Sequence, residues 1–65
     1  MDTNKRIMME CRYLLSLHKS FNELSNILDI NYNIINEDLN SKLFFIDKEL
    51  YYRVQKNIKK YNLDK

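Results

Sequence analysis

The chain has 65 residues, with eleven basic and nine acidic side chains, one cysteine, and neither glycine nor proline. So short a chain forms one small domain, residues 1–65, and leaves little room for a substrate cleft beside a supporting core, so we expect neither an enzyme nor a small-molecule substrate. A single cysteine forms no intrachain disulfide, and no apolar run approaches the roughly 20 residues that cross a bilayer, so we expect a cytoplasmic protein without a membrane partner.

Two helices are expected in the first part of the chain. Apolar residues at three- and four-residue steps predict a helix from about Asn4 to His18, capped by Thr3. Its inward stripe is Ile7, Met8, Cys11, Leu14, Leu15 and His18. Ser20 and Glu23 have the spacing of a capping box and predict a second, shorter helix. Its inward residues are Phe21, Leu24, Ile27 and Leu28.

The second half predicts two further helices. Because glycine is absent, Asp29 must supply the left-handed turn, after which Asn31 caps a helix from Tyr32 to about Leu43. Its buried side is Ile34, Ile35, Leu39 and Leu43, and we expect Phe44, Phe45 and Ile46 to form an apolar link tucked under the bundle. Asp47 then caps a helix over about 48–61, with Leu50, Val54, Ile58 and Tyr61 inward. No stretch alternates apolar and polar residues, so the predicted fold is an all-α bundle of about four helices.

Residues 20–43 also meet four requirements of a helix-turn-helix. Ser25 is small where two helices would cross, Asp29 tolerates the turn, and Ile30 is the apolar plug after it. The second helix must then bury residues about five and nine positions beyond the plug, where Ile35 and Leu39 stand. Together these positions predict a helix-turn-helix within the bundle.

A resemblance to a known family rests on the same residues. SFNELSNILDINYNIINEDLNSKL resembles, without a gap, the helix-turn-helix of the stage III sporulation protein D family of transcriptional regulators. RIMMECRYLLSLHKS is similar to the first helix of that family and FIDKELYYRVQKNIKKY to its C-terminal helix, so the resemblance covers about residues 5–62. The Ile35-x-x-Asp38-Leu39 ending is also similar to deoxyribose-type repressors.

The resemblance implies sequence-specific binding of double-stranded DNA. The second helix of the motif would enter the major groove, and a basic C-terminal region would contact the backbone, as a monomer. This chain departs from the family pattern at two positions, because Asp29 replaces the turn glycine and Glu37 replaces a base of the recognition helix. The chain is too short to hold the longer basic tail of the family.

Candidate base-reading residues lie on the predicted third helix, on the side opposite Ile35 and Leu39. Asparagine offers the edge of adenine a donor and an acceptor together, and glutamate accepts from cytosine N4. The candidates are Asn31, Tyr32, Asn33, Asn36, Glu37 and Asn40. The same pattern would arise if these were solvent-exposed residues that are frequent only because of the coding bias of an AT-rich genome.

Candidate phosphate-binding residues follow from the charge distribution. Residues 1–39 carry four bases and six acids, net −2, whereas residues 40–65 carry seven bases and three acids, net +4. Basic side chains that neutralise phosphates dominate affinity for DNA, and a helix N-terminus presents free N–H groups to phosphate. The candidates are Lys19, Ser20, Lys42, Arg53, Lys56, Lys59 and Lys60. A solvent-exposed helix face with no binding role would show the same pattern of basic residues.

A second hypothesis is a protein-binding adaptor that keeps the fold without binding DNA. Glu37 and the net charge of −2 over residues 1–39 favour it, and Tyr51 and Tyr52 would anchor the interface. His18 has no second ligand at metal spacing and Cys11 has no neighbouring base, so we expect neither a metal nor another cofactor. A monomer or a weak homodimer fits either hypothesis.

Overall fold

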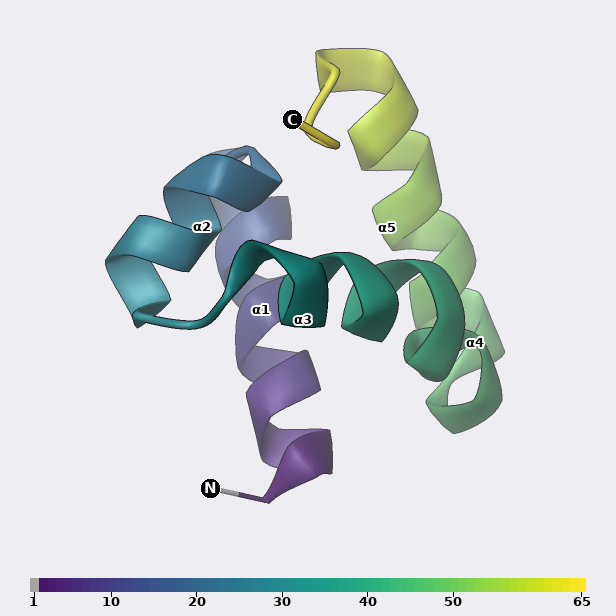
Figure 1. Cartoon of the computed structure of the whole chain (residues 1–65). Helices are drawn as coiled ribbons and strands as arrows, with labels where there is room; N and C mark the ends of the chain where they lie inside the picture. Colours follow the sequence, from purple (N-terminus) through teal and green to yellow (C-terminus); the bar gives the residue numbers. More distant parts are fainter. Residues whose placement is uncertain (1) are drawn as a thin grey trace.

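The computed structural model describes residues 2–65, and all regular secondary structure in that range is helical. The elements are α1 (Thr3–Leu17), α2 (Phe21–Leu28), α3 (Tyr32–Glu37), the π-helical turn η1 (Asp38–Lys42), α4 (Leu43–Ile46) and α5 (Lys48–Tyr61). Because α3, η1 and α4 follow one another without a break, the described residues form four successive helices (Figure 1). The predicted all-α fold class is confirmed, and the bounds predicted for the last helix match α5.

Local hydrogen bonds determine where the helices begin. The Ser20 hydroxyl accepts from the Glu23 N–H at 3.2 Å and the Glu23 carboxylate accepts from the Ser20 N–H at 3.0 Å, so the predicted capping box is present. Asn31 caps α3 and Asp47 caps α5, as predicted. The prediction for α1 is wrong by one residue: Asp2, whose carboxylate accepts from the Asn4 N–H at 2.7 Å, is the cap, and Thr3 is already helical.

Three helices end in a residue with left-handed backbone geometry. These residues are His18, Asp29 and Asn62, with φ of 53°, 54° and 53°. The Asp29 N–H and the Ile30 N–H both donate to the Ser25 carbonyl, which turns the chain from α2 toward α3. The turn predicted at Asp29 is therefore confirmed, on a residue that adopts this geometry at a cost that glycine does not bear.

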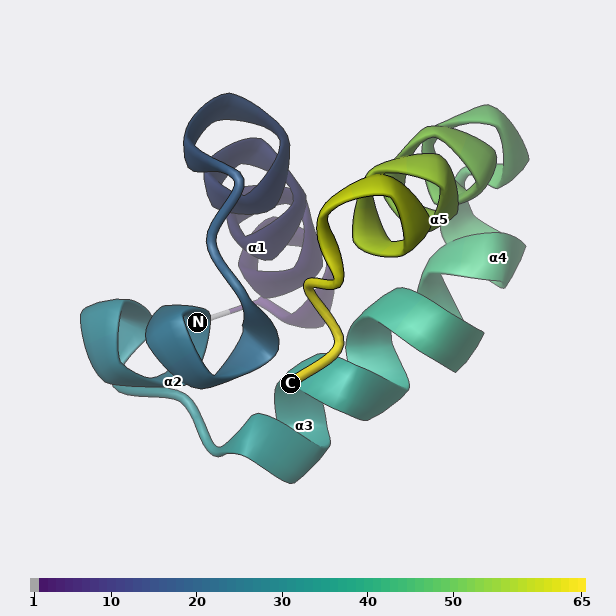
Figure 2. The same cartoon turned by 90° about the horizontal axis from the view of Figure 1, so that it is seen from above.

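All the helices contribute to one apolar core. Its buried residues are Ile7, Cys11, Leu14, Phe21, Leu24, Ile35, Leu39, Leu43, Val54, Ile58 and Leu63. The helix formed by α3, η1 and α4 crosses in front of α1, and α5 closes the far side (Figures 1 and 2). Ile35 and Leu39 are fully buried and Ile30 packs against the core, as predicted.

Several residues predicted to face inward are exposed instead. The segment Phe44–Ile46 is not a buried link: it is helical, and Phe45 is 83% exposed. Successive helical residues are turned by about 100°, so three apolar residues in a row cannot all face one core. Leu43 is the buried residue next to this segment. Of the neighbouring Ile34 and Ile35, Ile35 is buried and Ile34 is exposed. The other predicted inward residues found exposed are Met8, His18, Ile27 and Tyr61.

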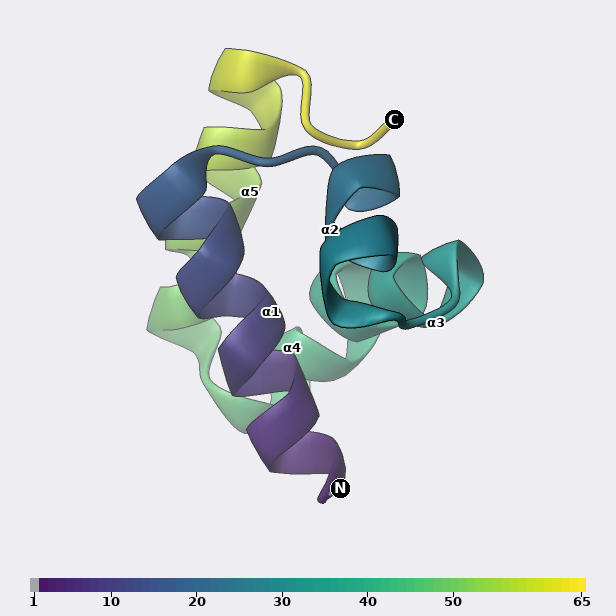
Figure 3. The same cartoon turned by 90° about the vertical axis from the view of Figure 1, so that its left-hand side faces the viewer.

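The residues after α5 return to the beginning of α2. Leu63 is buried in the core, and its carbonyl accepts from the Phe21 N–H at 2.7 Å. The Lys65 backbone oxygen accepts from the Asn22 N–H at 2.7 Å. Figure 3 shows this segment passing over the top of α2. We call Leu63–Lys65 the closing segment, because it connects α5 to α2 without a helix of its own.

Candidate nucleic-acid interface

The side of α3 and η1 away from the core is a row of polar, exposed side chains. Asn33, Asn36, Glu37 and Asn40 all lie there, opposite the buried Ile35 and Leu39. We call these four residues the outer face of α3. The structure thus brings four of the six predicted base-reading residues onto one surface, with the carboxylate of Glu37 among three amides.

Part of the outer face is fixed by α5. The Gln55 amide nitrogen donates to the Asn40 side-chain oxygen at 2.8 Å and to the Leu39 carbonyl at 3.0 Å. The Asn40 amide nitrogen in turn donates to the Asn36 side-chain oxygen. This chain of amides orients Asn40 and Asn36, and leaves the nitrogen of Asn36 as the free donor at its end.

The remaining two predicted base-reading residues have local partners. The Asn31 side chain accepts from the Asn33 N–H at 2.8 Å, so its oxygen caps the helix. The Tyr32 hydroxyl donates to the Asp64 carbonyl at 2.9 Å, and its ring packs edge-on against Phe21 with centroids 6.0 Å apart. Asn31 and Tyr32 therefore stabilise the start of α3 and its contact with the closing segment.

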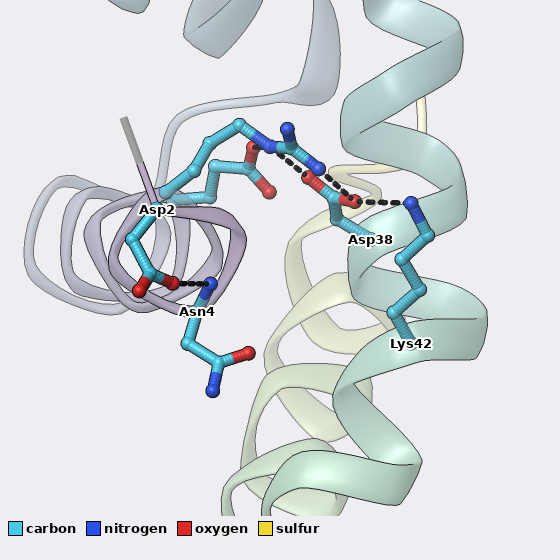
Figure 4. A network of polar contacts seen from close by, with 6 residues as sticks. Asp2, Asn4, Asp38 and Lys42 are labelled. Atoms are coloured by element: carbon cyan, nitrogen blue, oxygen red, sulfur yellow. Dashed lines mark hydrogen bonds and ion pairs between the residues drawn. The ribbon is translucent and has the colours of Figure 1, made fainter.

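A buried ionic cluster lies behind the outer face. Asp38 is fully buried and accepts two hydrogen bonds from the Arg6 guanidinium, from Nε and from Nη2, each 2.9 Å long. The ammonium of Lys42, a predicted phosphate ligand, lies 3.7 Å from the same carboxylate. Figure 4 shows Asp38 pointing toward α1 with Lys42 on its other side. This bidentate pair joins α1 to the π turn and so sets the position of the helix that carries the outer face.

Glu10 completes this cluster without a hydrogen bond of its own. Its side chain is fully buried, neither carboxyl oxygen has a hydrogen-bond partner, and Arg6 Nε lies 3.7 Å from Glu10 Oε2. Burial, followed by the neighbouring Asp38 carboxylate, raises the pKa of Glu10 from 4.5 to about 9. Glu10 is therefore a neutral carboxylic acid at pH 7, and the cluster holds one carboxylate against Arg6 and Lys42.

The start of α2 does not offer the free N–H groups expected at Lys19 and Ser20. The N–H groups of Phe21 and Asn22 donate to the closing segment, and the N–H of Glu23 donates to Ser20. The expectation that this helix start presents free donors to phosphate is wrong, because backbone oxygens and the capping hydroxyl occupy them. The Lys19 ammonium lies 3.6 Å from the Glu23 carboxylate and remains partly exposed.

The four basic residues predicted as phosphate ligands on α5 are spread over both flanks and the outward side of that helix. At about 100° per residue, Lys59 falls on the same flank as Gln55, next to the outer face, and Lys56 points directly away from the core. Arg53 and Lys60 fall on the opposite flank, beside Tyr61, whose ring lies 4.3 Å from that of His18 in α1. All four side chains are exposed. Lys56 and Lys59 are therefore the two closest to a polyanion lying along α3.

Sequence reasoning missed the contacts that join distant parts of the chain. Gln55 follows directly after the buried Val54, which places it at the edge of the buried stripe of α5, and this spacing was its only signal. Nothing in the sequence pairs Arg6 with Asp38, which lies 32 residues further along the chain. Within residues 2–65, no three histidine, cysteine or acidic side chains gather as a metal site would require.

Comparison of the chain with protein-family models, with curated proteins and with solved structures gave no match. No helix among the described residues is both long and apolar enough to span a bilayer.

Proposed function

We propose that the chain is a cytoplasmic transcriptional regulator that binds specific sequences of double-stranded DNA, as its resemblance to the sporulation regulators implies. In this proposal α2, the turn at Asp29 and α3 act as a helix-turn-helix, and α3 enters the major groove. Asn33, Asn36 and Asn40 read adenine edges, and Glu37 accepts from a cytosine N4 group. No catalytic step is involved.

The observation that carries the proposal is the pre-ordered amide row on the outer face of α3. Gln55 holds Asn40 and Asn40 holds Asn36, so these side chains are positioned before any partner arrives. An amide with a fixed orientation loses less conformational freedom when it pairs with a base, which favours selective recognition. Polar side chains that only contact solvent gain nothing from being held in one orientation.

The position of the basic residues supports the same proposal. Lys59 lies on the flank of α5 next to the outer face, Lys56 points away from the core, and residues 40–65 carry a net charge of +4. DNA lying against α3 would place its backbone within reach of these ammonium groups, which supply affinity without regard to sequence. Arg53 and Lys60, on the other flank of α5, contribute mainly at longer range.

Selection of bound sequences from a random duplex pool, followed by gel shifts at low salt, tests the proposal. Asn36→Ala is expected to reduce the preference for the selected site over random DNA by about tenfold, since a good amide–adenine pair contributes roughly 1–3 kcal/mol. Lys56→Ala is expected to weaken binding to every duplex alike and to reduce the salt dependence by about one counterion.

Two matched results decide the outcome. Lys5→Ala on α1 removes the same charge as Lys56→Ala, and it is expected to change affinity much less because α1 lies behind α3 (Figure 1). No duplex binding at micromolar protein and low salt, or a salt slope near zero, would contradict the proposal. If the Asn36→Ala variant kept the site preference of the wild type, Asn36 would not be a base-reading residue.

A second candidate function is a protein-binding adaptor without DNA binding. Glu37 places a carboxylate at the middle of the outer face, where DNA would bring phosphates nearby, and Tyr52 is 59% exposed. Copurification of a stoichiometric protein, together with absence of duplex binding, would favour the adaptor. Glu37→Gln separates the two candidates: it would increase non-specific DNA affinity in a DNA reader and leave an adaptor that does not bind DNA unable to shift any duplex.

A further inference from the structure

The corner between α4 and α5 exposes a cluster of large apolar side chains. Phe45 is 83% exposed and Tyr52 is 59% exposed, and Ile46 is exposed beside them. The cluster is continuous, because the ring of Phe44 packs edge-on against those of Phe45 and Tyr51, with centroids 5.3 and 5.2 Å apart, and Tyr51 packs on Tyr52 at 5.4 Å. We call Phe44, Phe45, Ile46, Tyr51 and Tyr52 the corner patch.

We propose that the corner patch is the interface of a two-fold symmetric dimer of this chain. A two-fold axis pairs each residue with its counterpart across the interface, so the patch must be compatible with itself. Its rim meets this condition, because Asp47, Lys48 and Glu49 place both signs of charge side by side at the start of α5. A rim of one sign would repel a second copy, and the two acids disfavour nucleic acid here.

The exposed area fits a weak dimer. Taking about 200 Å² for a phenylalanine or tyrosine side chain, Phe45 and Tyr52 expose on the order of 300 Å² in each copy. Exposed apolar patches of this size on small proteins often mark an interaction site. With its rim, a contact centred on these rings falls in the small class of interfaces, below roughly 1,200 Å² in total, which is typical of weak and transient complexes.

Sedimentation velocity of the whole chain, from about 1 to about 500 μM, tests the interface directly. We expect the wild type to pass from monomer to dimer within this range, and the double variant Phe45→Ser/Tyr52→Ser to dimerise at least tenfold more weakly. The matched control is Met8→Ser/Leu17→Ser, which removes two exposed apolar residues from α1 and is expected to stay within twofold of the wild type. Phe45 and Tyr52 are largely exposed, so far-UV circular dichroism should show unchanged helix content.

A wild type that remains monomeric at about 500 μM would overturn the inference, as would a corner variant that dimerises like the wild type. Selection of DNA sites separates this failure from failure of the proposed function. Paired half-sites for the wild type, and single half-sites for the corner variant, would support both proposals. If the chain dimerises but binds no duplex, the proposed interface is supported and the proposed DNA binding is overturned. If it binds duplexes selectively but stays monomeric, DNA binding is supported and the interface is overturned.

Discussion

The helix formed by α3 and η1 has two polar sides of opposite character. The side toward α1 holds Asp38, fully buried and bound by two hydrogen bonds to Arg6, with the neutral Glu10 beside them. The side toward solvent holds the exposed Asn36, Glu37 and Asn40, of which Asn40 and Asn36 are joined by an amide hydrogen bond. Adjacent residues, Glu37 and Asp38, thus carry the same charge in unrelated surroundings.

The buried side of this helix therefore contributes mainly to stability, and the exposed side is available for recognition. A buried charge that loses its partner cannot form replacement hydrogen bonds with water, so its loss destabilises the fold. An exposed amide that loses its partner can form such bonds, so its loss costs little stability. Substitutions behind the helix should therefore act on folding, and substitutions in front of it should act on binding. Three substitutions test this division, and the largest expected effect comes first.

Asp38→Ala should be the most destabilising of the three. It removes both hydrogen bonds to the Arg6 guanidinium, whose side chain is 22% exposed, so the expected cost is about 3 kcal/mol, at the lower end of the range for fully buried pairs. For so small a domain this is a large part of the free energy of unfolding, so we expect the midpoint of urea unfolding to fall well below that of the wild type. Glu37→Ala is the adjacent control, expected within about 0.5 kcal/mol of the wild type. Equal effects of the two would contradict the division.

Glu10→Gln should stabilise the protein at alkaline pH. The pKa of Glu10 is raised from 4.5 to about 9, so the folded protein keeps a proton that the unfolded chain releases. The resulting stability is fully present below pH 4.5 and is lost as the pH rises to about 9. The glutamine variant cannot ionise, so at pH 8 we expect it to exceed the wild type by on the order of 2–3 kcal/mol, and at pH 5 to match it closely.

Thermal unfolding at several pH values measures this effect. Glu49→Gln, on the exposed first turn of α5, is the matched control substitution. A wild type whose stability does not fall between pH 5 and pH 9 would show that Glu10 is not held neutral.

Gln55→Ala should change stability least and recognition more. It removes the donor that joins α5 to Asn40 and to the Leu39 carbonyl, at a cost of about 1 kcal/mol. The amide row would lose its orientation, so site preference in the duplex selection should broaden while overall affinity changes little. Asn57→Ala is a matched control, because its side-chain nitrogen donates to the Arg53 carbonyl within α5. Identical behaviour of the two variants would mean that the row is not ordered by Gln55.

Features determined by neighbouring residues could be predicted from the sequence. The Ser20–Glu23 capping box, the turn at Asp29 and the cap at Asp47 each depend on hydrogen bonds that span at most five residues, so their chemistry is visible in the chain order. The spacing of Ile35 and Leu39 likewise identified the inward side of α3, and hence the exposure of Asn33 and Asn36.

Features determined by distant residues could not be predicted. Whether Phe45 or Ile34 is covered depends on which helix packs against that side, and the periodicity of a single helix does not carry that information. The Arg6–Asp38 pair and the closing segment on α2 each join positions more than 30 residues apart. The expectation of free N–H groups at Ser20 failed for this reason, since backbone oxygens from the other end of the described chain fill them.

The three left-handed residues that end α1, α2 and α5 also matter for how this protein can change. His18, Asp29 and Asn62 hold a backbone geometry that glycine would adopt with no side-chain penalty, yet the sequence contains no glycine. Each is a position where one substitution relieves strain without altering a packed contact in the core. The chain therefore has an unused reserve of stability at its helix ends, which would allow costly changes on the outer face of α3 to be tolerated while new binding preferences evolve.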